Sequence, residues 1–168
     1  MQNTKPFSKS LLIYLMVCFC CLCGFDAGQK AKAPELPATL ADMQLKKTIS
    51  GIEANKMIFG MHGKATGPNS NSLIGYYGAE EPKNVLYLTA FENKDWAQQA
   101  LDKMVEKMAN SSFGFSLPQS EKHGSDVIYR CSGMGLSHFF YRHENLLLWL
   151  QAEKGKAAAG LEDLQAHF

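Results

Sequence analysis

The sequence predicts an α+β fold, in which an antiparallel sheet of about five strands packs against helices on one of its faces. Two observations predict it. Runs of alternating or continuous apolar residues lie close together at 136–142 and 146–152, and the three-and-four spacing of an amphipathic helix occurs at 95–109. Because strands do not alternate with helices, as a parallel sheet requires, we expect the order α-ββ-α-βββ-α.

The first half of the domain predicts two helices and two strands. Ser50 and Glu53 have the spacing of a capping box, so a helix is expected at 50–61. A further short helix is expected at 39–47. Strands should follow at 73–77 and 85–91, and the second is apolar on both faces, which favours a central position.

The second half predicts a helix, three strands and a closing helix. Asn93 is a suitable N-cap for the helix at 95–109. An irregular crossing that contains Pro118 is expected at 113–124. Strands at 127–131, 136–142 and 146–152 follow, and a helix at 157–167 ends the chain.

The N-terminal region has the layout of an export signal. Lys5 and Lys9 precede an apolar, uncharged run at 11–25, which is shorter than the roughly 20 residues of a membrane-spanning helix. We therefore expect a signal peptide or lipoprotein signal at 1–25, a polar tether at 26–38 and a single domain at 39–168. The expected location is the periplasm or the cell envelope, and membrane contact is expected only through this N-terminal region.

Cysteine usage bears on both processing and stability. Four of the five cysteines lie in the apolar run, and Cys23 near its end is the candidate for acylation, although Leu22 occupies the place of the usual small residue. Soluble release and lipid anchoring both remain open. Removal of the leader leaves Cys131 as a lone thiol, so the fold must depend on its hydrophobic core rather than on disulfides.

The balance of charged residues excludes one class of partner. The chain has 17 lysines and arginines against 16 acidic residues. A nearly neutral chain has no basic surplus with which to bind a phosphate backbone, so nucleic acid is not expected. No motif predicts a cofactor.

Two groups of residues could carry chemistry. Met57, Met61 and His62 follow one another at helical spacing and offer the soft ligands that suit Cu(I). Cys131 could act as a nucleophile with His138 or His143 as its base. In the structural alternative, these methionines fill the core and the thiol is buried. Arg130 should point to the opposite side of its strand from Cys131 and so cannot activate it.

Aromatic residues on the expected strands suggest a binding surface. If one sheet face is left uncovered, Tyr76, Tyr141 and Arg142 would line an amphipathic patch. The sequence therefore favours an exported, non-catalytic binding or accessory protein that presents an aromatic-rich sheet face to a protein or an apolar ligand. The alternative is a small exported copper carrier or a cysteine-dependent enzyme.

Overall fold

The computed structural model describes residues 34–62, 70–78, 83–110 and 114–168, and all of them belong to one compact unit. The expected leader, Cys23 and the tether as far as residue 33 lie outside the described residues.

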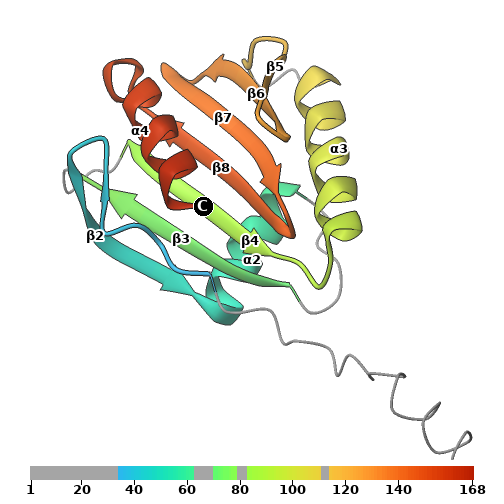
Figure 1. The fold of residues 1–168 in the computed structure, drawn as a ribbon, viewed down its shortest axis with the longest axis horizontal. Coiled ribbons are helices and arrows are strands. Elements are labelled where there is room, and N and C mark those ends of the chain that lie inside the picture. The colour runs from blue at the N-terminus through green and yellow to red at the C-terminus, as the bar shows by residue number, and fades with distance from the viewer. Residues whose placement is uncertain (1–33, 63–69, 79–82, 111–113) are drawn as a thin grey trace, which may run out of the picture. The chain divides into compact units, whose positions relative to one another are not determined.

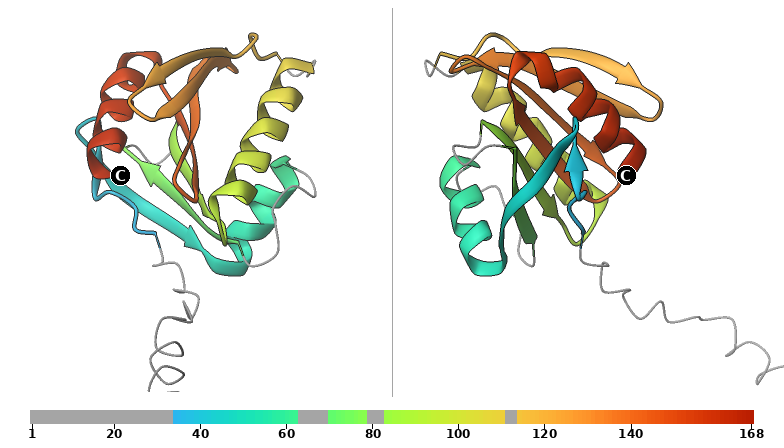
Figure 2. Two further views of the ribbon diagram at one scale, coloured as in Figure 1. Left: turned by 45° about the vertical axis from the view of Figure 1, so that its right-hand side comes forward. Right: turned by 90° about the vertical axis from the view of Figure 1, so that its left-hand side faces the viewer.

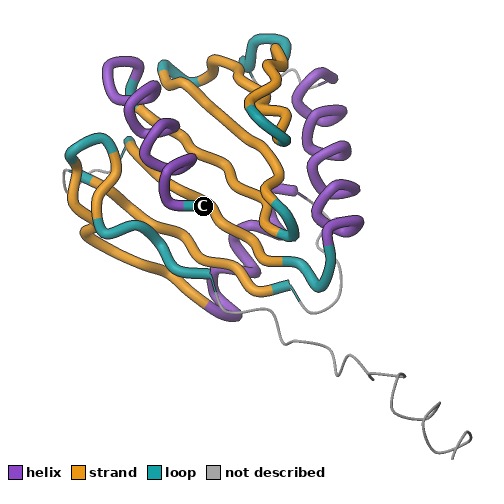
Figure 3. The backbone as a smooth tube through the Cα atoms, viewed as in Figure 1, coloured by secondary structure: helices purple, strands orange, loops and turns teal. Residues whose placement is uncertain are grey.

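Within the part of the chain that the structure describes, eight strands form one antiparallel sheet in the order β1-β2-β3-β4-β8-β7-β6-β5, with β4 and β8 in the middle (Figure 1). The last four strands follow one another through short turns, as Figure 3 shows. The strands are β1 (Thr39–Leu40), β2 (Met43–Ser50), β3 (Asn71–Tyr77), β4 (Asn84–Ala90), β5 (Gln119–His123), β6 (Asp126–Gly133), β7 (Leu136–His143) and β8 (Leu146–Ala152).

The α+β class and the antiparallel sheet are confirmed, but the expected strand number and order are wrong. The helix expected at 39–47 is instead β1 and β2, joined by a turn in which Ala41 and Asp42 both have positive φ. A register shift between Leu45 and Lys47 interrupts the alternation of β2 and hides it in the sequence. All residues of β5 are exposed, so no apolar pattern marks this strand.

Three helices are described: α2 (Gly51–His62), α3 (Lys94–Asn110) and α4 (Lys154–His167). The helix at 95–109 begins as expected, because Asn93 Oδ1 accepts hydrogen bonds from the backbone N–H groups of Asp95 and Trp96 at 3.1 and 3.0 Å. The other expected cap does not form, since Ser50 ends β2 and the helix starts at Gly51 with φ of 64°. None of the described helices is both long and apolar enough to span a membrane.

The helices cover both faces of the sheet, not one as expected. Trp149 and Leu147 of β8 pack against α3, whereas Leu150 and Ala152 pack against Ala157 of α4. Figure 2 shows α3 and α4 on opposite sides of the strands, with α2 on the side of α3. The reason is the composition of β8, which is apolar on both faces, so that each face needs a cover.

Candidate functional site

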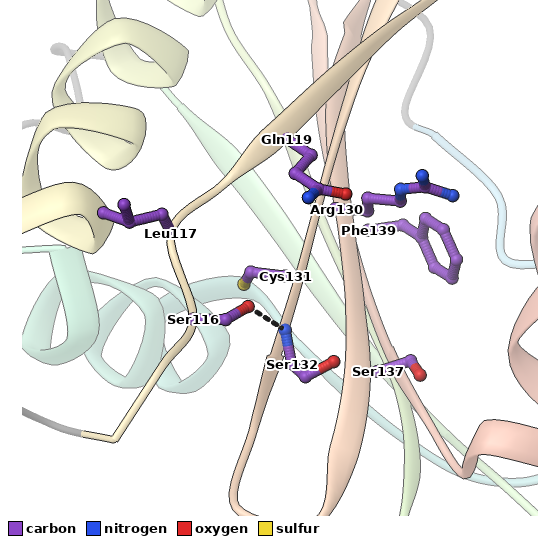
Figure 4. A pocket seen from close by; sticks show the side chains of 8 residues that line it. All are labelled: Ser116, Leu117, Gln119, Arg130, Cys131, Ser132, Ser137 and Phe139. Carbon is purple, nitrogen blue, oxygen red and sulfur yellow. Dashed lines mark hydrogen bonds between the residues drawn. The ribbon is translucent and has the colours of Figure 1, made fainter.

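A hollow of about 400 Å³ opens between β6, β7 and the segment that leads into β5 (Figure 4). Its volume lies at the lower end of the range typical of small-molecule sites. The lining residues are Ser116, Leu117, Gln119, Arg130, Cys131, Ser132, Ser137 and Phe139.

A break in strand pairing creates this hollow. Phe115 bridges Gly133, and Ser116 donates its backbone N–H to the carbonyl of Ser132 at 2.8 Å. Ser132 in turn donates its N–H to the hydroxyl of Ser116 at 2.9 Å instead of to a backbone carbonyl. Regular pairing then resumes only at Gln119, opposite Arg130. The chain therefore carries one extra residue here, as in a β-bulge, and residues 116–118 form an arch beside β6.

Gly133 holds one end of the arch in place. A Cβ atom at this position would lie 2.3 Å from Cδ1 of Phe115, so only a glycine lets the phenyl ring lie on the backbone. The ring meets the imidazole of His138 edge-on, with 5.1 Å between the centroids. The arch is thus anchored in the core under α3.

The open side of the hollow combines one cation with an aromatic ring. Arg130 of β6 and Phe139 of β7 are cross-strand partners, and they point away from Leu117 and Cys131 (Figure 4). Among the residues that the structure describes, the Arg130 guanidinium has no ion pair or hydrogen bond. The described residues of the lining include no carboxylate. This surface can therefore accept an anion from outside the described residues.

Cys131 borders the hollow, but its side chain belongs to the core. It packs with Phe140 and Trp149 and is 6% exposed. Burial raises the pKa of the thiol to about 11. A reactive cysteine needs a lowered pKa, so this environment favours the neutral, unreactive thiol.

Neither histidine expected as a base for Cys131 is free to act on it. His138 lies opposite Cys131 on β7, but its Nδ1 accepts from the Trp149 indole at 3.2 Å. Nε2 must then carry the proton, which it donates to the carbonyl of Gly133 at 3.1 Å. His143 lies at the opposite end of β7, and its Nδ1 contacts Oδ2 of Asp126 at 2.8 Å. The described residues thus form no cysteine–histidine pair suited to nucleophilic catalysis.

The expected aromatic patch is not assembled. Tyr76 lies on β3, with the Lys47 amine 5.8 Å from its ring centroid. Tyr141 lies on the sheet face that α4 covers and is buried there, and this burial raises the pKa of its hydroxyl. Arg142, its neighbour on β7, points to the face that α3 covers, where Nε donates to Oε1 of Gln98 at 2.8 Å. Adjacent strand residues alternate in direction, so Tyr141 and Arg142 cannot share one surface.

The expected copper ligands differ in their surroundings. Met57 is 40% exposed, whereas Met61 packs against two core clusters. The side chain of His62 lies outside the described part of the structure. Among the described residues, no three histidine, cysteine or acidic side chains are grouped so that they could hold a metal ion.

Sequence analysis did not find the residues of the hollow as a site. Arg130 was correctly expected to point away from Cys131, and Pro118 was placed in an irregular segment. Pro118 and Gly133 were the available signals, since both residue types often accompany breaks in strand pairing. No local pattern links these two residues to Phe139, which lies beside Arg130 only because β6 and β7 pair in this register.

The fold defines this chain as an antiparallel α+β domain with helices on both faces. No family model matches the chain, and no curated protein matches it in sequence. Among solved structures, the extracellular domain of PknH from Mycobacterium tuberculosis is similar in part. It is 12% identical, the match covers 66% of this chain and 74% of that one, and the TM-score is 0.38.

Proposed function

We propose that this chain is an exported, non-catalytic binding protein whose hollow takes a ligand with a carboxylate, or a similar anion, next to an apolar group. One observation carries the proposal: the guanidinium of Arg130 lies beside Phe139 in the hollow, and among the described residues it has no partner and the lining has no carboxylate. This binding surface replaces the patch expected around Tyr76.

The chemistry of the hollow supports binding rather than catalysis. The Cys131 thiol is neutral in the core. Both ring nitrogens of His138 are already hydrogen-bonded, one to the Gly133 carbonyl and one to the Trp149 indole. The other polar groups are three serine hydroxyls and the amide of Gln119. Such groups orient a ligand through hydrogen bonds, and among the described residues none of the three serine hydroxyls is hydrogen-bonded to a histidine that could act as its base.

The guanidinium and the ring suit two parts of one ligand. A guanidinium presents a planar fork of donors that matches a carboxylate. Phe139 is half-buried and packs against the clusters under α4, so its ring is a fixed apolar surface. A ligand that carries an acid a few bonds from an apolar group would satisfy both residues.

Export is the part of the proposal that depends on the sequence alone. Lys5 and Lys9, followed by the apolar run at 11–25, support secretion to the periplasm or the cell envelope. The ligand is therefore to be sought outside the cytoplasm.

The test is a titration of the full chain with phenylacetate and with phenylacetamide, its uncharged counterpart, followed by NMR shifts of residues 116–119 and 130–139. We expect the acid to bind more tightly than the amide, by roughly 10-fold or more, because a hydrogen bond to a charged group contributes about 1.5–3 kcal/mol. The variant Arg130→Gln should bind both compounds equally weakly.

The matched control is Lys103→Gln, which removes one exposed positive charge from the outer face of α3. It should leave the affinity for phenylacetate unchanged. If acid and amide bind alike, or if both charge variants weaken binding equally, the proposed site is wrong.

A further inference from the structure

A second cross-strand pair lies beside Arg130 and Phe139 on the open side of the hollow. Ser132 of β6 and Ser137 of β7 are directly opposite each other, two residues along each strand from the first pair. Side chains two residues apart on a strand point to the same face of the sheet, so the four side chains share one surface. Figure 4 shows all four on the same side of their strands.

The two serine hydroxyls on this surface are available to a ligand. Ser132 is exposed and Ser137 is half-buried, and neither hydroxyl has a hydrogen-bond partner among the described residues. The backbone N–H of Ser132 donates to Ser116, but the Ser132 hydroxyl points away from that contact (Figure 4). A serine hydroxyl can both donate and accept. The pair can therefore bind one hydroxyl group of a ligand through two hydrogen bonds.

The other end of the same surface is suited to an acid. Gln119 of β5, Arg130 and Phe139 form one row across three strands. The Gln119 amide and the Arg130 guanidinium both offer N–H donors, and the guanidinium adds a positive charge. The surface therefore has a charged end with an aromatic ring beside it, and a neutral end that carries only hydroxyl groups.

The spacing between the two ends limits the shape of the ligand. Two residues along a strand cover about 6.5–7 Å. In a phenylacetate that carries a hydroxyl at ring position 4, the carboxyl carbon and the phenolic oxygen are separated by a similar distance. A hydroxyl at position 2 would lie close to the carboxylate and could not reach the serines at the same time. The volume of the hollow, about 400 Å³, suits a single-ring molecule of this size.

We infer that the ligand of the hollow is a hydroxyaryl acid, a small molecule whose aromatic ring carries a carboxylate arm on one side and a hydroxyl on the other. Arg130 and Gln119 bind the carboxylate, and the ring of the ligand packs on Phe139. Ser132 and Ser137 bind the hydroxyl. This inference rests on the proposed function, because it names the class of ligand for the same site.

The first experiment compares four ligands on the full chain by NMR titration: phenylacetate, 4-hydroxyphenylacetate, 4-methylphenylacetate and 2-hydroxyphenylacetate. The methyl group resembles the hydroxyl in size but cannot form a hydrogen bond. We expect 4-hydroxyphenylacetate to bind at least about 3-fold more tightly than each of the other three, because a net hydrogen bond between neutral groups gives a gain of this order. In Arg130→Gln all four acids should bind weakly.

The second experiment removes the serine hydroxyls. The double variant Ser132→Ala with Ser137→Ala should bind 4-hydroxyphenylacetate no more tightly than 4-methylphenylacetate, yet keep the wild-type affinity for phenylacetate. Ser120→Ala is the matched control, because Ser120 follows Gln119 on β5 and so faces the other side of the sheet. This control should preserve the preference for the hydroxyl.

A third measurement decides the matter even if the double variant does not fold. Nuclear Overhauser contacts in the wild-type chain should connect the ring protons of bound 4-hydroxyphenylacetate with the ring of Phe139 and with the Cβ protons of Ser137. Binding without these contacts would overturn the inference, because the ligand would then lie elsewhere.

The outcomes separate the two proposals. If phenylacetate binds through Arg130 but a hydroxyl at position 4 gives no gain over a methyl group, the inference is overturned and the proposed function stands. The same conclusion follows if the gain persists without the two serine hydroxyls, or if a hydroxyl at position 2 gives an equal gain. If none of the acids binds in a manner that depends on Arg130, both proposals fail.

Discussion

Trp149 donates its indole N–H to Nδ1 of His138 across 3.2 Å, within the core between the sheet and α3. This bond forces the imidazole proton onto Nε2, which donates to the carbonyl of Gly133. The histidine is fully buried and satisfied as a neutral group. A buried histidine in this state links β8, β7 and the end of β6, and it has consequences for stability.

Stability should fall as the pH drops below about 6.5. Burial lowers the pKa of His138 below its ordinary value of 6.5, so the unfolded chain takes up a proton before the folded chain does. The contribution of this group is complete above pH 6.5 and is lost as the pH falls toward the folded-state pKa, by up to about 1.4 kcal/mol at pH 5.5. Urea unfolding of the wild type and of His138→Gln between pH 7.5 and 5.5 measures it. A difference in unfolding free energy between the two proteins that stays constant over this range would contradict the expectation.

The thiol of Cys131 should react slowly in the folded protein. Because burial raises its pKa from 9.0 to about 11, the thiolate population at pH 8 is about a hundredfold smaller than for an unperturbed thiol. Iodoacetamide labelling of the full chain, with peptide-resolved mass spectrometry, reports on this cysteine alone. The same labelling in concentrated urea is the control and should be fast. Rapid modification of the native chain would show that the thiol is activated.

Gly133→Ala should destabilise the domain by about 1–3 kcal/mol, the usual cost of overpacking, because the new Cβ would meet the ring of Phe115. The double variant Gly133→Ala with Phe115→Ala should lose less unfolding free energy than the two single variants lose in sum. Gly60→Ala is a suitable control, since a Cβ there meets nothing within 4 Å inside α2. That change should stabilise the chain by roughly 0.5–1 kcal/mol. Chemical denaturation of the wild type, the two single variants, the double variant and Gly60→Ala measures these differences.

Tyr77→Phe should loosen the segment that leads into β1. The buried Tyr77 hydroxyl donates to the carbonyl of Pro37 at 3.0 Å, and its loss leaves that carbonyl without its partner at a cost of about 1–2 kcal/mol. Limited proteolysis should then cut more quickly at 34–38. Tyr129→Phe serves as the control, because its half-buried hydroxyl makes no such bond among the described residues. Equal cleavage of the two variants would mean that the Tyr77 bond does not hold this segment.

The sequence predicted those elements whose apolar residues repeat within the element itself. The run at 146–152 and the helix stripe around Leu101 and Met104 depend only on spacing along the chain, and both are present as expected. β5 has no buried residue, and β2 is interrupted by a register shift, so neither could be found by periodicity. β8 is apolar on both faces, and this pattern requires helices on each face of the sheet, whereas the expected fold placed helices on one face only.

The candidate site was decided by tertiary structure. Gln119, Arg130 and Phe139 lie side by side because three strands pair in one register, and that register depends on a turn at Gly124 and an arch held by Phe115 on Gly133. Cross-strand pairing joins Gln119 to Arg130 and Arg130 to Phe139, which are eleven and nine positions apart, and no spacing rule along a single chain encodes such pairs. Local composition therefore determined the class of fold, whereas only the pairing of the strands in the tertiary structure brings the Arg130 guanidinium beside the ring of Phe139.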